Sequence, residues 1–188
     1  MAKITRTEYK LEEARFFLKH IEEHWRHVPN VDFYLSAFVS AARSVTWVMK
    51  AEFKKMPGWM EWYETKKASK EIRALLKQMN NIRVQSTKSV PIRTRTTAKV
   101  HIRPEDLTPE LMEILQNKGK DVVNLEPADP SNTNFLLKHG ERVFARAYLE
   151  KAVHELPGFE GKDSKDVCKM YLHELDGLVE ECLKKFHL

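Results

Sequence analysis

One stretch of this chain holds all of its positive charge excess. The 188 residues carry 32 Lys and Arg against 27 Asp and Glu, a formal net charge of +5. Between Glu71 and Glu105 there is no acidic residue at all. The cations of that interval are Arg73, Lys77, Arg83, Lys88, Arg93, Arg95, Lys99 and Arg103. Charge of a single sign, gathered in one segment, predicts contact with an acidic partner such as a nucleic acid.

The second half of this acid-free segment alternates like a β-strand. Between Ile92 and Arg103, apolar or small residues occupy the even positions, and cations or polar residues occupy the odd ones. Cations at alternate positions of a strand lie about 6.6–7 Å apart, a spacing that suits a phosphate backbone. The predicted nucleic-acid-binding residues are Arg83, Lys88, Arg93, Arg95, Lys99, His101 and Arg103. The alternatives are an edge strand protected by its charges or neutralisation by acidic residues from elsewhere in the fold.

Three histidines have the spacing of a metal-binding helix face. His20, His24 and His27 stand at i, i+4 and i+7, with Glu23 beside them. They lie opposite the apolar face of the helix that contains them, so we interpret them as solvated. No further Cys or His motif accompanies them, and the sequence therefore predicts no metal and no cofactor.

Two other kinds of reactive side chain have structural interpretations. Arg43 interrupts an apolar helix, and we expect it to be partly buried and paired with a carboxylate; the alternative places it in a pocket near the end of the third helix. Cys168 and Cys182 stand 14 residues apart in one predicted helix, about 21 Å by helical rise. That separation excludes a disulfide. With no apolar leader or spanning segment in view, we expect a cytoplasmic protein.

Hydrophobic periodicity predicts a mainly α-helical chain with a small β insertion. Apolar residues recur at the helical period over 9–28, 32–55, 59–80 and 164–186. The second of these segments is apolar over so wide an arc that it should be buried on more than one side. Strand alternation covers 92–102, and 141–153 is either its pairing partner or a helix. We expect a short helix at 108–116 and a loop at 124–134, with the tryptophans in the core or at a dimer interface.

Several of these segments resemble a known family. The resemblance is carried by Phe33-Tyr34-Leu35-Ser36-Ala37-Phe38, Ala41-Ala42-Arg43-Ser44-Val45, Pro57-Gly58, Trp62-Tyr63, and Asp166-Val167-Cys168 with Tyr171, Leu172 and Leu175. They are similar to an uncharacterised prokaryotic branch of the HEPN superfamily. The resemblance implies a four-helix up-and-down bundle that forms a homodimer. Residues 1–188 would then be a single domain, with three helices in 9–82, a small antiparallel β insertion in 90–156 and a C-terminal helix in 163–187.

The resemblance also indicates where a ribonuclease site would lie. Active members carry an Arg-Asn pair at the end of the third helix, followed by a His, and use them without metal. Asn80 matches the Asn, but Met79 stands at the Arg position, and Val84 or Gln85 stands at the His position. Met cannot hold a phosphate, and neither Val nor Gln can transfer a proton. This motif is therefore degenerate, and we predict no catalytic residue.

Three functional hypotheses follow from the sequence. The first is a non-catalytic HEPN-like protein that binds RNA or another polyanion through its basic segment. The second is an interaction module of a toxin–antitoxin or defence pair, whose basic face meets an acidic protein. The third is a ribonuclease with an unconventional site built from Arg83 and His101.

Overall fold

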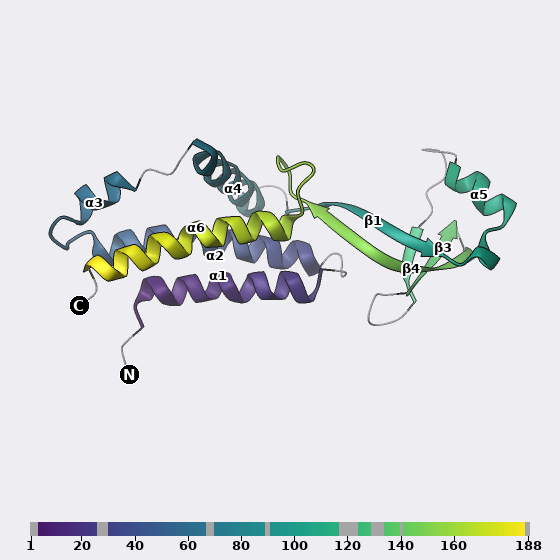
Figure 1. Cartoon of the computed structure of the whole chain (residues 1–188), viewed down its shortest axis with the longest axis horizontal. Coiled ribbons are helices and arrows are strands. Elements are labelled where there is room, and N and C mark those ends of the chain that lie inside the picture. The colour runs from purple at the N-terminus through teal and green to yellow at the C-terminus, as the bar shows by residue number, and fades with distance from the viewer. Residues whose placement is uncertain are drawn as a thin grey trace. The chain divides into compact units, whose positions relative to one another are not determined.

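The chain forms two compact units (Figure 1). The computed structural model describes residues 4–25, 30–66, 70–88, 91–116, 124–128, 134–139 and 141–186. Unit 1 comprises Met1–Arg95 and His154–Leu188, and unit 2 comprises Thr96–Val153. Unit 2 falls within the 90–156 segment that the sequence predicts as an insertion.

Unit 1 is helical and is organised around α2. Its helices are α1 (Arg6–Glu23), α2 (Asn30–Phe53), α3 (Trp59–Thr65), α4 (Lys70–Lys88) and α6 (Ser164–Phe186). Helix α2 packs against α1, α4 and α6, and α1 also contacts α6. This arrangement confirms that the second predicted helix is buried on several sides. Its fully buried residues include Leu35, Phe38 and Met49.

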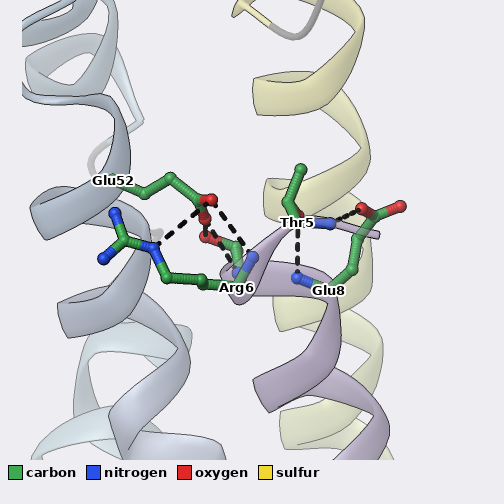
Figure 2. Close-up of polar contacts among 5 residues, drawn as sticks. Thr5, Arg6, Glu8 and Glu52 are labelled. Atoms are coloured by element: carbon green, nitrogen blue, oxygen red, sulfur yellow. Dashed lines mark hydrogen bonds and ion pairs between the residues drawn. The ribbon is translucent and has the colours of Figure 1, made fainter. Parts of the chain in front are cut away.

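The first turn of α1 is held by two sets of polar contacts (Figure 2). Thr5 and Glu8 form a capping box, in which the Thr5 hydroxyl accepts from the Glu8 N–H at 3.0 Å and the Glu8 carboxylate accepts from the Thr5 N–H at 2.8 Å. Glu52, in the last turn of α2, accepts from the backbone N–H groups of Arg6 and Thr7 at 3.1 and 2.9 Å. The buried Thr7 hydroxyl donates to the same carboxylate at 2.7 Å. Glu52 thereby satisfies helix N–H groups that have no partner inside α1.

The structure corrects the predicted boundaries of the first helix, 9–28, and of the third, 59–80. The single helix expected at 59–80 is two helices, α3 and α4, and α4 continues to Lys88. Helix α3 ends at Thr65, whose hydroxyl bonds back to the Trp62 carbonyl at 2.6 Å, a local contact that competes with helix continuation. Helix α1 ends at Glu23, before the predicted Val28. In contrast, α6 spans the predicted residues 164–186, and Asp163 caps it by accepting from the Lys165 N–H at 2.9 Å.

Unit 2 is built on an antiparallel sheet. Its strands are β1 (Arg95–Ile102), β2 (Asn124–Pro127), β3 (Asn134–His139) and β4 (Arg142–Glu155), in the order β1-β4-β3-β2. The strand alternative for 141–153 is thus confirmed, and β4 neighbours β1 as predicted. The short helix α5 (Pro109–Gln116) also matches the prediction, and a 3-10 turn (Pro104–Asp106) precedes it.

The loop expected at 124–134 is wrong, because β2 begins at Asn124. This strand pairs with β3, with Leu125 opposite Leu137 and Pro127 opposite Phe135. It is four residues long and ends in a proline, which an edge strand tolerates because one side of its backbone needs no ladder partner. A strand of four residues is too short to show the alternation that predicts a strand.

The alternation of β4 separates a buried face from an exposed one. Ala145, Ala147 and Leu149 are buried, whereas Arg146 and Tyr148 between them are exposed. Among the described residues, no helix is long and apolar enough to cross a membrane.

Both cysteines are buried, but the tryptophans differ in their exposure. Cys168 and Cys182 are both buried, unpaired thiols. Trp59 and Trp62 lie in the core, but Trp47 is 65% exposed and so is not a core residue.

Candidate functional site

The unit 1 half of the basic segment carries cations without described acidic partners. Arg83 and Lys88 lie in the last turns of α4, and Arg93 and Arg95 follow on the way into β1. Lys88, Arg93 and Arg95 are exposed, and Arg83 is half-buried. No carboxylate of the described residues lies within 4.0 Å of any of the four. Their charges are therefore available to an external anion.

Buried neighbours fix the direction of Arg93 and Arg95. Ile92 is buried in the core of unit 1, and Thr94 donates to Asp32 at the start of α2, from its N–H at 3.2 Å and from its hydroxyl at 2.8 Å. Successive side chains of an extended chain point to opposite sides. With Ile92 and Thr94 turned inward, Arg93 and Arg95 are turned outward.

The unit 2 half of the segment is partly neutralised. Glu150 on β4 bonds both Lys99 Nζ, at 2.7 Å, and His101 Nε2, at 2.6 Å. Hydrogen bonding by the Lys99 ammonium, with a smaller contribution from His101, holds the pKa of Glu150 below its ordinary value. Arg103 lies 3.9 Å from Glu105. The alternative of neutralisation by acidic residues from elsewhere thus holds for Lys99 and His101, whereas Arg83, Lys88, Arg93 and Arg95 have no acidic partner among the described residues.

The residues that the resemblance aligns with a ribonuclease motif, Met79 to Gln85, lie inside α4 rather than at a helix end. Met79 is fully buried in the helical core, where an arginine would be left without solvent. Asn80 is half-buried and accepts from Arg43 Nε at 3.1 Å. Val84 is half-buried and Gln85 is exposed. Arg83 belongs to unit 1 and His101 to unit 2, where it is bonded to Glu150.

Arg43 lies at a cleft of about 620 Å³ that α2, α3, α4 and α6 line. Its guanidinium bonds Asn80 and the Thr46 hydroxyl, the latter at 3.0 Å, and lies over the Trp47 ring at 5.8 Å. No carboxylate within the described part of the chain pairs with it, so the predicted ion pair stays a prediction. The alternative prediction, a pocket residue next to the third-helix motif, describes its position better.

One ion pair and one buried tyrosine set the chemistry of this cleft. Lys66 forms an ion pair with Glu181 and lies over the Trp62 ring at 5.7 Å. Burial raises the pKa of Tyr171 to about 12, with a smaller opposing effect of Arg43, so its hydroxyl stays protonated near neutral pH. Arg73 and His173 are exposed at the rim. The cleft can bind a polar ligand, but Tyr171 cannot serve as its base.

The histidine face of α1 is less solvated than the sequence predicts. His20 stacks on Tyr34 with ring centroids 5.1 Å apart, and its side chain is only 25% exposed. His24 is half-buried, and His27 lies outside the described residues. The predicted solvation is therefore wrong for His20, because Tyr34 of α2 covers its ring.

Sequence reasoning missed three contacts that join distant parts of the chain: Glu150 with Lys99, Asp32 with Thr94, and Asn80 with Arg43. Glu150, Asp32 and Asn80 each act across more than 30 positions of sequence, at separations of 51, 62 and 37 residues. Only the alternation of β4 placed Glu150 on an outer face, and nothing in the sequence paired it with Lys99. Comparison with protein-family models, curated proteins and solved structures finds no match for this chain.

Proposed function

We propose that this protein is a non-catalytic, HEPN-like RNA-binding protein. The proposal rests on the resemblance of its helical segments and on the packing of α2 against α1, α4 and α6, with α1 also against α6. The ligand is RNA or a polyanion of similar charge density, and the binding residues are those of the acid-free segment.

The single observation that carries the proposal is the set of cations without a described acidic partner. Arg83, Lys88, Arg93 and Arg95 form a short run of sequence between the end of α4 and the start of β1. A cation without a carboxylate partner can neutralise a phosphate and release a counterion of the nucleic acid, whereas a cation bound to a carboxylate must first give up that bond. The unit 1 half should therefore supply most of the electrostatic affinity, with Lys99, His101 and Arg103 as weaker contributors.

Binding is favoured over catalysis for two reasons. Met79 and Val84 bring neither charge nor a proton-transfer group to the positions of the family motif. Asn80, the residue that matches, is engaged by Arg43 at 3.1 Å. A ribonuclease built from Arg83 and His101 would need His101 to leave Glu150 before it could act as a base.

A salt titration with single-stranded RNA tests the proposal. The test variant changes Arg83, Lys88, Arg93 and Arg95 to Gln. Single strands lose about 0.7 units of log–log salt slope per lost contact, so we expect a slope smaller by about 3 units. The matched control changes four exposed lysines elsewhere in unit 1, Lys54, Lys55, Lys162 and Lys185, to Gln. Equal decreases in salt slope for the two variants, or no RNA binding by the native chain at low salt, would overturn the proposal.

An acidic protein partner, as in a toxin–antitoxin or defence pair, would use the same cations. Poly-glutamate added as competitor separates the two cases. It should displace RNA only at a large excess if the segment is built for closely spaced phosphates. Displacement at equal charge concentration would favour the protein partner. Light scattering during the same experiments tests the proposed homodimer.

A further inference from the structure

Three potential metal ligands gather at the C-terminal end of α1. His20, Glu23 and His24 stand at i, i+3 and i+4, which puts them on one face of the helix. One ligand atom from each lies within 4.8 Å of the other two. Two imidazoles and a carboxylate are a ligand set for a divalent transition metal, whereas Ca²⁺ and Mg²⁺ favour oxygen ligands alone.

His20 is fixed in place by aromatic neighbours. Its ring stacks on Tyr34 at an interplanar angle of 17° and meets Phe16 edge-on, with centroids 4.3 Å apart. Its Nδ1 atom is buried and makes no hydrogen bond within the described residues, although it lies 3.2 Å from Oε2 of Glu23. Two ligands of a tetrahedral Zn²⁺, each about 2.0–2.1 Å from the metal, lie about 3.4 Å apart. The two atoms are therefore already at the separation that a shared metal would impose.

His24 is held in the tautomer that a metal site requires. Its Nδ1 donates to the backbone carbonyl of His20 at 3.0 Å. A carbonyl can only accept, so the proton of the neutral ring is on Nδ1 and the lone pair is on Nε2. Metal-binding histidines are usually oriented by such a bond from the other ring nitrogen.

The local electrostatics favour a cation. The site occupies the last turn of α1, where the helix dipole is negative, and Glu23 adds a full charge. Lys19 competes for Glu23, but it lies 3.6 Å from Oε1 and has a largely exposed side chain. The other oxygen, Oε2, is the one that faces His20.

We propose that His20 Nδ1, the Glu23 carboxylate and His24 Nε2 bind one Zn²⁺, or a divalent transition metal of similar preference. Three protein ligands leave a fourth position for water or an external donor. The site shares no residue with the basic segment, so the test of metal binding is independent of the test of RNA binding.

Titration of the untagged full-length chain with Zn²⁺ and with Co²⁺ tests the site. We expect one equivalent of Zn²⁺ to bind and raise the thermal unfolding temperature. Co²⁺ should give the intense visible absorption of four-coordinate geometry, and Zn²⁺ should abolish it. Loss of one ligand in His24→Gln or Glu23→Gln should weaken Zn²⁺ binding by at least about 10- to 100-fold, the loss typical even of residues that only orient ligands.

Two controls keep the test decisive. His173→Gln removes an exposed histidine of α6, and Glu22→Gln removes the neighbouring carboxylate, which is bonded to Lys169 at 2.7 Å. Both should bind Zn²⁺ like the native chain. His20→Gln also removes the stack on Tyr34. If that variant fails to fold, Glu23→Gln and His24→Gln carry the conclusion. Failure of the native chain to bind one equivalent, or native-like binding by His24→Gln, overturns the proposal.

Discussion

Two glutamates, one in each unit, have pKa values below the ordinary value for different reasons. Glu52 in unit 1 is 18% exposed; burial by itself raises its pKa, but hydrogen bonds from the Thr7 hydroxyl and from the Arg6 and Thr7 N–H groups outweigh that effect. Glu150 in unit 2 is exposed and is bonded mainly by Lys99, then by His101. The first carboxylate satisfies backbone groups, and the second covers surface cations. The lowered pKa of Glu52 therefore accompanies contacts that stabilise α1, whereas the lowered pKa of Glu150 accompanies the pairing of surface cations.

The largest expected difference between substitutions of Glu52 and of Glu150 is in the free energy of unfolding. Glu52→Gln should lower the free energy of unfolding by about 1–3 kcal/mol, because bonds to a charged acceptor at a helix N-terminus are lost or weakened. Chemical denaturation at neutral pH measures this change. Glu150→Gln is the matched control and should unfold like the native protein. Equal destabilisation by the two substitutions would contradict the distinction.

Acid should affect the Glu52 contribution in a defined direction. Because its folded-state pKa is lowered, the stability it contributes is fully present above the ordinary value of 4.5 and is lost as pH falls through the lower folded-state pKa. Native protein should therefore lose more stability than Glu52→Gln over that interval. Denaturation midpoints measured from pH 6 downward compare the two. Parallel curves would show that Glu52 is not a source of the acid sensitivity.

A smaller effect is expected on binding. Glu150→Gln removes the carboxylate shared by Lys99 and His101, and it should strengthen RNA binding by about fivefold at 0.1 M salt, the value of one additional phosphate contact. Titration at that salt concentration, and again at higher salt where the gain should shrink, measures the change. Weaker binding by Glu150→Gln would mean that Glu150 orients these cations rather than covering them.

The smallest effect is expected from an ion pair of unit 2 that has two hydrogen bonds. Arg142 forms two bonds with Glu110, at 2.6 and 2.8 Å, joining β4 to α5. Both side chains are more than half exposed, so Glu110→Gln should cost no more than about 0–1 kcal/mol. Thermal unfolding in low and high salt measures this cost, which should vanish in high salt. A loss as large as that of Glu52→Gln would show that exposure is a poor guide here.

The extent of sequence-based prediction differs between local and long-range features. The span of α6, the two strands around 95–102 and 142–155 and the outward direction of Arg93 and Arg95 followed from periodicity, because burial of one face constrains every second or every third and fourth residue. The break between α3 and α4 was missed, because neither Gly nor Pro marks it. Strand β2 was missed because four residues show no period.

In the candidate site, too, local features could be predicted from the sequence and long-range contacts could not. The charge pattern alone located the acid-free segment, and the family resemblance drew attention to Met79 and Val84. Neither could show that Glu150 covers Lys99 and His101, that Asn80 meets Arg43, or that His20 lies against Tyr34.

The sequence by itself thus determined where the charge is, which faces are apolar and which reactive side chains stand one helical turn apart. Each of these depends on neighbours along the chain, and neighbour spacing is fixed by the geometry of the backbone. Only the tertiary structure decided which cations have an acidic partner among the described residues and which histidine packs against an aromatic ring. Those properties depend on partners 14 to 62 residues away, and chain folding alone brings such partners within bonding distance.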